Sequence, residues 1–262
     1  MKFRHIFLLP VFLALVVLFV VFYYKFDPAL LTRLSFYVNL ANPYMRIVRV
    51  EEGLRKEEVA KVIADKLDWS EQDKENFINN ANSASVEGHY FPKTYLIYKD
   101  DNPSAVTATM LDEFGAQVSK IKKPKSTKIL NEDTALKVAS IIQREAAGKK
   151  DMNLISGIIW NRIFKGMKLQ IDATLQYAKG SEEDGWWGQV TSEDKKIKSP
   201  YNTYLYAGLP PGAIANPGLA AISAAYNPQK TNCLFYLHDK NRKIHCTKTY
   251  EEHKRNIKTY LK

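Results

Sequence analysis

Residues 138–145 read Val-Ala-Ser-Ile-Ile-Gln-Arg-Glu, and this stretch decides the interpretation of the chain. Val138, Ile141, Ile142 and Glu145 follow one another at i, i+3, i+4 and i+7, which places them on one face of a helix. The glutamate therefore falls on the apolar stripe of that helix, while its two preceding neighbours point away. A carboxylate on a core-facing stripe is the unusual feature from which the functional interpretation starts.

The ends of this helix have ordinary signals. Asp133 or Thr134 is expected to cap it, and we predict helix over 135–147 with Gly148 as its stop. A second helix is predicted over 152–165, since its apolar residues recur with the same period.

Partial burial would make Glu145 a candidate general acid. Loss of hydration penalises the charged form of a carboxyl group and raises its pKa toward the range useful for donating a proton. Two plainer alternatives stay open at this point: Glu145 pairs with a buried Arg such as Arg162, or it lies at a frayed helix end.

The segment after the second helix has polar side chains that are candidates either for binding a ligand or for capping a helix. Residues 167–172 alternate like a strand, so Gln170 and Asp172 are expected on one face, with Asp172 also able to cap a helix over 173–178. The Pro- and Gly-rich stretch 208–218 predicts a stiff loop that opens a helix over 219–226. Four aromatic residues are candidates either for stacking on sugar rings or for packing: Trp186, Trp187, Tyr201 and Tyr204.

The first half predicts a smaller α+β module. A strand is expected at 46–50, and helices at 55–67, 70–78 and 105–118. The lysine-rich stretch 120–128 is typical of a solvated linker and suggests a domain boundary.

The N-terminus predicts a membrane anchor. Residues Ile6–Tyr24 form an uncharged apolar run, close to the roughly 20 residues that a helix needs to cross a bilayer. A cleaved signal peptide is the rival, but its apolar region is shorter and ends at a small-residue site. Lys2 and Arg4 before the run favour a cytoplasmic N-terminus, which places the rest of the chain outside the cytoplasmic membrane.

The chain is basic, with a net charge of +10. Residues 1–25 hold three of its 38 Lys and Arg and none of its 28 Asp and Glu, which leaves 35 against 28, or +7, for the exported part. Such a charge suits a polyanionic wall or a lipid surface, or it serves solubility alone. Nucleic acid is not an expected partner, because the protein is exported and has no recognised nucleic-acid motif.

Two cysteines, Cys233 and Cys246, flank a predicted hairpin with strands at 234–238 and 243–247. Pairing Asp239 with Arg242 would place the cysteines diagonally, which disfavours a disulfide, although the exported location would allow one. No zinc-ligand spacing is present, and neither a metal nor a cofactor is expected.

Several segments, taken in order, resemble the MltG (YceG-like) endolytic murein transglycosylase family. The matching motifs are Glu87-Gly88 through Tyr95, Val138 through Glu145, Trp160 through Ile163, Gly166 through Thr174, Tyr201 through Tyr204, Gly208 through Gly218 and Thr249 through His253.

The resemblance implies a LysM-like N-terminal module and places Glu145 at the family's catalytic glutamate. The residues implied to line the glycan groove are Glu87, Gln170, Asp172, Asn202, Thr203 and Tyr204. The implied reaction is cleavage of the bond between N-acetylmuramic acid and N-acetylglucosamine (MurNAc and GlcNAc) with formation of a 1,6-anhydro ring. Peptidoglycan strands, the inner membrane and peptidoglycan synthases are the implied partners.

The sequence departs from the family pattern in its C-terminal motif and two residues before Glu145. Ile244 and Cys246 stand where relatives have a His and an aromatic residue, and Gln143 replaces a second acidic residue. A hydrolytic muramidase and a catalytically silent wall-binding scaffold remain the alternatives.

The predicted fold class is thus α+β. The predicted organisation is a leader (1–5), a transmembrane helix (6–24), a connector (25–45), a LysM-like module (46–119), a basic linker (120–133) and a mixed α+β catalytic domain (134–262).

Overall fold

The structure of the protein is a computed structural model that describes residues 8–23, 34, 42–79, 87–124 and 130–261. It divides into two compact units, Met1–Arg46 and Ile47–Lys262. The predicted module at 46–119 and the predicted domain at 134–262 therefore both lie in the second unit, except for residue 46.

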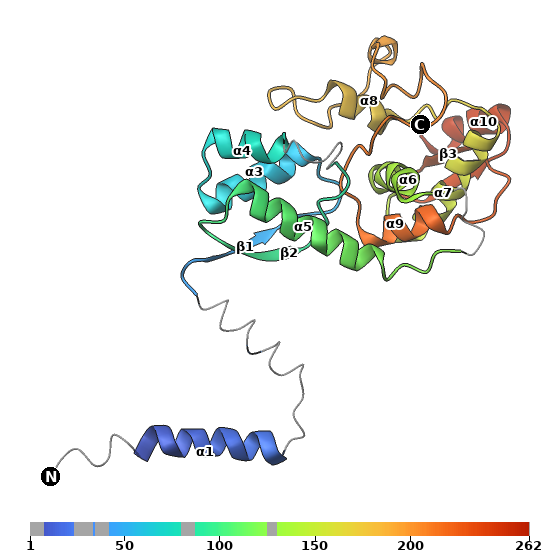
Figure 1. The fold of residues 1–262 in the computed structure, drawn as a ribbon. Coiled ribbons are helices and arrows are strands. Elements are labelled where there is room, and N and C mark those ends of the chain that lie inside the picture. Colours follow the sequence, from blue (N-terminus) through green and yellow to red (C-terminus); the bar gives the residue numbers. More distant parts are fainter. Residues whose placement is uncertain (1–7, 24–33, 35–41, 80–86, 125–129, 262) are drawn as a thin grey trace. The chain divides into compact units, whose positions relative to one another are not determined.

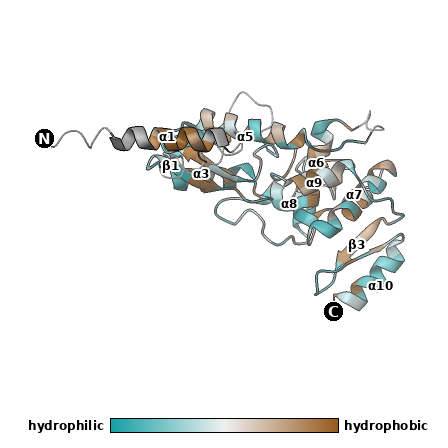
Figure 2. Ribbon diagram, turned by 90° about the horizontal axis from the view of Figure 1, so that it is seen from below, coloured by the Kyte–Doolittle hydropathy of each residue, from teal (hydrophilic) through white to brown (hydrophobic). Residues whose placement is uncertain are grey.

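The first unit contains α1, Leu8–Tyr23. The part of α1 that is coloured in Figure 2 is hydrophobic, and its described side chains are exposed. Residues 6, 7 and 24 of the predicted span lie outside the described residues, as do the leader 1–5 and most of the connector. Within the described ranges, no helix combines the length and apolarity needed to cross a bilayer.

The second unit begins as a small α+β arrangement that agrees with the prediction for this half. Its elements in order are β1 (Met45–Arg49, starting at the end of the first unit), α3 (Lys56–Leu67), α4 (Glu71–Ile78), β2 (Thr94–Tyr98) and α5 (Pro103–Val118). Strands β1 and β2 form one small sheet, and Val50 N–H donates to the Lys93 carbonyl where β1 ends and β2 begins. A first core forms where α3, α4 and α5 close over this sheet.

The remainder is mainly helical. Its elements are α6 (Glu132–Glu145), α7 (Lys149–Phe164), α8 (Asp172–Lys179), the short 3-10 helix η2 (Asp194–Lys196), α9 (Leu219–Tyr226), β3 (Phe235–His238), β4 (Ile244–Thr247) and α10 (Tyr250–Tyr260). Helices α6, α7 and α9 pack side by side around a second core (Figure 1). Helix α10, which was not predicted, packs on the β3–β4 hairpin.

Helix α5 takes part in both cores. Val106 and Met110 belong to the first core, whereas Phe114 and Val118, two turns further along, belong to the second. One continuous helix therefore carries hydrophobic packing from the small module into the mainly helical part.

The predicted ends of α6 were wrong by a few residues. Asn131 is its cap, because the Asn131 side chain accepts a hydrogen bond from the Thr134 backbone N–H. At the other end Ala146 is already extended, so the helix ends at Glu145, two residues before the predicted end at 147. Helix α7 likewise starts earlier than predicted, at Lys149.

The predicted strand at 167–172 does not form. Gln170 has a positive φ of 53°, which ends any regular extended run. The backbone N–H groups of Gln170 and Ile171 bond to the Thr203 carbonyl and hydroxyl instead of to a neighbouring strand. Asp172 is the first residue of α8, and Ile171 rather than Asp172 occupies the cap position.

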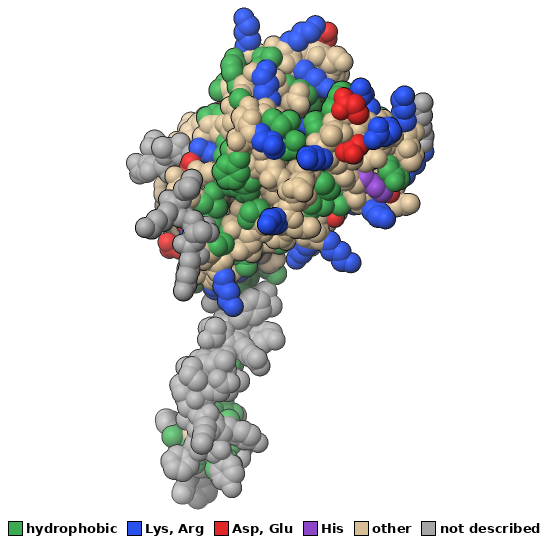
Figure 3. Space-filling view, turned by 90° about the vertical axis from the view of Figure 1, so that its right-hand side faces the viewer, with side chains coloured by type: hydrophobic (Ala, Val, Ile, Leu, Met, Phe, Trp, Pro, Cys, Tyr) green, Lys and Arg blue, Asp and Glu red, His purple; other side chains and the backbone are tan. Residues whose placement is uncertain are grey.

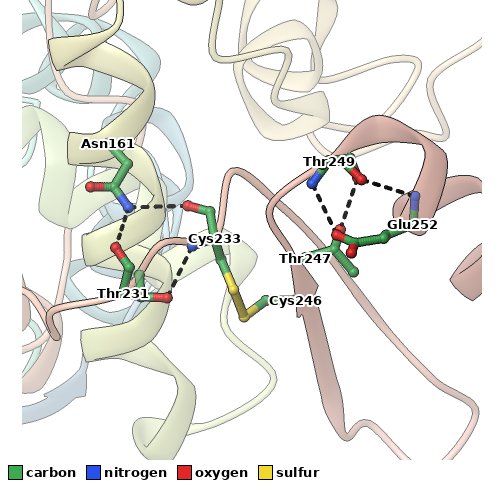
Figure 4. The surroundings of a disulfide bond; sticks show 7 residues. All are labelled: Asn161, Thr231, Cys233, Cys246, Thr247, Thr249 and Glu252. Atoms are coloured by element: carbon green, nitrogen blue, oxygen red, sulfur yellow. Dashed lines mark hydrogen bonds between the residues drawn. A yellow bond between two sulfur atoms is a disulfide. The ribbon is translucent and has the colours of Figure 1, made fainter.

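The hairpin forms where predicted, but its register and its cysteines differ from the expectation. Asp239 pairs with Lys243, and both Leu234 and Phe235 face Thr247, so the chain bends just before β3. Regular ladder spacing therefore does not apply at Cys233. A disulfide joins Cys233 to Cys246, with their Cα atoms 5.8 Å apart, beside hydrogen bonds that Asn161 donates to the carbonyls of Thr231 and Cys233 (Figure 4).

A buried polar cluster joins the two halves of this unit. Asn216 is fully buried and exchanges backbone hydrogen bonds with Gly53 and Leu54, while its side chain accepts from the Tyr90 N–H and donates to Glu87. Glu87 also accepts from the Lys56 N–H at the start of α3 and from the Tyr177 hydroxyl on α8. Residues from both halves therefore depend on one carboxylate for their hydrogen bonds.

Basic side chains are widely distributed over one face of the molecule (Figure 3). Lys and Arg side chains are spread over the face shown in Figure 3 instead of gathering in one patch, with a few Asp and Glu among them. This distribution agrees with a general attraction to anionic surroundings more than with a focused basic binding site.

The buried cluster gives a prediction about stability and pH. Burial, followed by the negative charge of Glu57, raises the pKa of Glu87 to about 7, from 4.5 in water. The folded protein then binds more protons than the unfolded chain between these values, so this group makes the unfolding free energy fall as pH rises, by up to about 3 kcal/mol. Relative to Glu87→Gln, the wild type should lose stability between pH 5 and pH 8 in urea unfolding experiments. Parallel stabilities of the two proteins over that range would contradict the assignment.

The disulfide gives a second stability prediction. It closes a loop with a sequence separation of 13 residues, and cross-linking a loop of this size stabilises a fold by about 3 kcal/mol. The double variant Cys233→Ser/Cys246→Ser should therefore melt several degrees below the oxidised wild type. Wild-type protein treated with a thiol reductant is the matched control, and it should melt close to the double variant. An unchanged melting temperature in both would show that the bridge adds no stability.

Candidate active site

Glu145 lies at the edge of the second core. Val138, Ile141 and Ile142, the other members of its stripe, are fully buried, and the helix ends at the glutamate itself. The side chain is half-buried as a result. The apolar stripe thus carries the carboxyl group from the interior to a surface opening.

That opening is a cleft of about 600 Å³. Glu145 lies in it together with side chains from α7, the 169–172 segment, the β3 strand and α10. Its lining residues are Glu145, Ile158, Ile159, Arg162, Leu169, Gln170, Ile171, Asp172, Lys195, Tyr204, Phe235, Tyr236, Leu237, His238, Tyr250, His253, Ile257 and Leu261. Polar groups gather around Glu145 and Asp172, and apolar side chains come mostly from α7, β3 and α10.

The pKa of Glu145 is raised above its ordinary value. Burial is the main cause, and the negative charge of Asp172 adds to it. Three neighbours act in the opposite direction: the Tyr236 hydroxyl, which donates to Oε2 at 2.6 Å, the charge of His238, and the Ala173 backbone N–H at the start of α8. The net effect of these neighbours is a raised pKa, which favours the protonated form of Glu145 more than in a solvated glutamate.

The structure agrees with neither of the two plainer interpretations of Glu145, an ion pair with Arg162 or a frayed helix end. Arg162 donates to the carbonyls of Leu234, Lys168 and Leu169, and among the described side chains no Lys or Arg forms an ion pair with Glu145. Although Glu145 ends its helix, hydrogen bonds and packing hold that end in place. A carboxyl group that the described Lys and Arg side chains leave without an ion pair, beside an open cleft, can exchange a proton with a bound molecule.

Three of the predicted groove residues lie in the same cleft. Asp172 accepts a 2.6 Å hydrogen bond from the Tyr204 hydroxyl, which fixes the two side chains relative to each other. Gln170 lines the cleft beside them, and its positive φ turns the backbone there. Glu145, Gln170, Asp172 and Tyr204 are thus brought together, as expected from the sequence.

The other three predicted groove residues are buried and do not line the cleft. Glu87 is only 5% exposed and belongs to the buried cluster at Asn216. Asn202 is fully buried, donates to the carbonyls of Lys195 and Ile197, and accepts from the Tyr204 N–H. These bonds hold in place the loop that carries Tyr204.

Thr203, the third of them, has the same kind of role. Its hydroxyl accepts from the Ile171 N–H and bonds to the Thr174 hydroxyl, while its carbonyl accepts from the Gln170 N–H. Thr203 therefore sets the backbone of the 170–172 segment, and its side chain does not reach the cleft.

Most of the candidate aromatic residues serve packing. Trp186 stacks against the Arg55 guanidinium at 4.3 Å, and Trp187 against that of Arg144 at 3.6 Å. Tyr201 packs on another tyrosine, and Tyr204 alone among the four lines the cleft. The Tyr204 ring has a cation over it as well, since Lys195 Nζ lies 4.7 Å from the ring centroid.

Sequence reasoning missed Tyr236 and His238. The alternation of the predicted strand was a signal that their side chains share one face, but nothing in the local pattern shows that this face meets the end of α6. In the described part of the chain, no group of three or more His, Cys, Asp or Glu side chains is placed to hold a metal ion.

Comparisons with known proteins agree with one another. A model of the YceG-like family matches residues 23–259. An endolytic murein transglycosylase of Bacillus subtilis (strain 168) is 32% identical over 244 residues, which cover 84% of this chain and 67% of the relative. A protein with the same description from Streptococcus pneumoniae (D39) is 30% identical over 178 residues, which cover 67% of this chain and 32% of that relative. The chain therefore spans about a third of the pneumococcal protein.

A solved structure adds to this. The crystal structure of a yceG-like protein from Listeria monocytogenes matches with a TM-score of 0.69 and 26% identity, covering 80% of this chain and 75% of that one. The match includes most of the second unit.

The charges around Glu145 give a prediction that needs no substrate. Asp172 raises the pKa of Glu145 by charge repulsion, so Asp172→Asn should lower it. Carboxyl-carbon NMR titration of Glu145 in the wild type and the variant would measure the change. A Glu145 titration curve that does not move to lower pH would show that the two carboxyl groups do not interact.

Proposed function

The chain belongs to the YceG-like family, and from this premise we propose that it is an endolytic peptidoglycan lytic transglycosylase that uses Glu145 as its acid and base. The observation that carries the proposal is the Glu145 carboxyl group, which is half-buried, has a raised pKa and stands in an open cleft beside a neutral hydrogen-bond donor. The relatives named endolytic murein transglycosylases give the substrate, peptidoglycan, and the internal position of the cut.

The reaction follows from one carboxyl group used twice. Protonated Glu145 gives its proton to the glycosidic oxygen between MurNAc and GlcNAc as the bond from that oxygen to C1 breaks. The resulting carboxylate takes the proton of the MurNAc 6-hydroxyl, and O6 closes onto C1 to form a 1,6-anhydro ring. The GlcNAc residue leaves with a free 4-hydroxyl, Glu145 is protonated again, and water is not consumed.

The raised pKa suits both steps. A group must be protonated to serve as the acid and ionised to serve as the base, and such a group works best when its pKa is close to the working pH. Burial moves Glu145 in that direction, while Tyr236 and the Ala173 N–H keep the carboxylate form accessible. Most glycosidases divide these tasks between two carboxyl groups.

Substrate contacts are assigned by position. Gln170, Asp172 and Tyr204 line the cleft and are the proposed contacts to the glycan. Asn202 and Thr203 support them through the hydrogen bonds described above, whereas Glu87 joins the two halves of the unit. The LysM-like character of the first module and its binding of glycan also belong to the proposal.

The cellular location is proposed from the sequence together with the substrate. The apolar run that includes α1 would anchor the chain in the cytoplasmic membrane by a single pass, with the cleft on the extracytoplasmic side. An anchored enzyme would meet glycan strands close to where they are made. Cutting there would end the elongation of a strand, and peptidoglycan synthases are the proposed partners.

The proposal predicts the effect of one conservative substitution. Glu145→Gln keeps the shape of the side chain but removes proton transfer, so glycan-strand cleavage should fall at least about 100-fold. Purified glycan strands, with products identified by mass spectrometry, give the measurement. The wild type should release internal fragments that end in 1,6-anhydro-MurNAc.

Glu183→Gln is the matched control, because Glu183 is exposed and lies outside the cleft. It should retain wild-type activity. Products with only reducing ends would indicate a hydrolytic muramidase, and undiminished cleavage by Glu145→Gln would remove Glu145 from the chemistry. Binding of strands without any cleavage by the wild type would indicate a scaffold.

A further inference from the structure

The hairpin β3–β4 lies against the end of α6, and it places a tyrosine on the glutamate there. The Tyr236 hydroxyl donates a 2.6 Å hydrogen bond to Glu145 Oε2, and both groups line the cleft. We propose that Tyr236 is a positioning residue for Glu145, and that the hairpin is fastened to the second core in order to hold it there. The inference rests on the proposed function of Glu145 and adds a residue to it.

The base of the hairpin is tied down at several points. Arg162 on α7 donates at 2.6 Å to the Leu234 carbonyl, two residues before Tyr236, and its guanidinium lies 4.9 Å over the ring of Phe235. Asn161 donates to the carbonyls of Thr231 and Cys233, and the disulfide then joins Cys233 to β4 (Figure 4). The chain entering β3 is therefore fixed to α7 and to its partner strand.

The far end of the hairpin is tied to the same region. His238, at the end of β3, lies 3.2 Å from Asp151 on α7. Arg242, in the turn, donates at 2.6 Å to the carbonyl of Ala147, just beyond the end of α6. Contacts on both sides of Tyr236 thus leave its ring little freedom to move away from Glu145.

A tyrosine suits this position because it stays a donor. Burial and the nearby Glu145 raise the pKa of Tyr236 well above its ordinary value, so the hydroxyl remains protonated over the working range. It donates to one carboxyl oxygen, Oε2, whether or not Glu145 is protonated. The Ala173 backbone N–H at the start of α8 also interacts with the carboxyl group, so Glu145 is positioned from the strand and from α8.

The remaining titratable or charged groups around Glu145 come from every element that packs near it. They are Arg144 on α6, Asp151 and Arg162 on α7, Asp172 on α8, Lys195 on η2, Tyr204 on the loop that follows, His238 on β3, and Tyr250 and His253 on α10. Among them Arg162 and Asp151 are engaged with the hairpin, and Asp172 with Tyr204. From strand β3, the Tyr236 hydroxyl donates a hydrogen bond to the Glu145 side chain.

Removing the hydroxyl should have two separate effects. Without the bond the carboxyl group is free to rotate, so kcat should fall by about 10- to 100-fold while KM stays within about twofold. Because the lost bond favoured the carboxylate, the pKa of Glu145 should rise and the alkaline limb of the kcat/KM profile should move up by about one pH unit. Asp172→Asn should move the same limb downward, since it removes a neighbouring negative charge.

The experiment compares wild type, Tyr236→Phe, Asp172→Asn and Glu145→Gln on purified glycan strands from pH 4 to pH 9, with the melting temperature of each. Tyr98→Phe is the matched control, because Tyr98 is an exposed tyrosine on β2 outside the cleft, and its profile should equal that of the wild type. Phe at position 236 retains the ring, so folding should be preserved.

Two results would overturn the inference. One is a Tyr236→Phe profile that matches wild type in kcat and in its alkaline limb. The other is an equal loss of activity at every pH together with a lower melting temperature, which would make Tyr236 a purely structural residue. Either result leaves the proposed function standing if Glu145→Gln is inactive, whereas a wild type that releases no anhydro products would reject the proposed function itself.

Discussion

The burial of α6 is the constraint on which the rest of the structure depends. Packing of Val138, Ile141 and Ile142 against α7 and α9 fixes the rotation of this helix, so the next residue of the stripe must face the cleft. A glutamate in that place loses part of its hydration as a direct result of the hydrophobic packing before it. The altered acidity of Glu145 is thus a product of the core, and the surrounding loops only adjust it.

The loops around the cleft are organised by buried polar side chains. Asn202 and Thr203 satisfy the backbone groups of two irregular segments, and this holds Tyr204 against Asp172 at the start of α8. Asn216 and Glu87 do the same between the two halves of the unit. The precision of the site therefore comes from hydrogen bonds that a substrate never touches.

The sequence was informative wherever structure follows from local periodicity. Apart from α10 and the short η2, the helices were predicted within a few residues, as was the hairpin. The stripe ending at Glu145 was recognised because a helical repeat needs no long-range information. The strand expected at 167–172 was wrong, because Thr203, some 30 residues away, captures its backbone N–H groups. Glu87, Asn202 and Thr203 have the chemistry of binding residues, and the pattern alone does not distinguish a polar side chain that faces a ligand from one that faces the protein. Tyr236 was not predicted as a site residue, because its partner Glu145 lies 91 positions away and local periodicity contains no information about such a contact.

The bridge between Cys233 and Cys246 has a practical consequence for handling the protein. The disulfide links the two sides of the hairpin that contains Tyr236, but both cysteines are thiols when the chain is synthesised. A preparation made in a reducing cytosol therefore starts with that hairpin unlinked, and with Tyr236 less firmly held than in material that matured in an oxidising space. Specific activities from the two sources become comparable only after thiol titration has established how many molecules in each carry the bond.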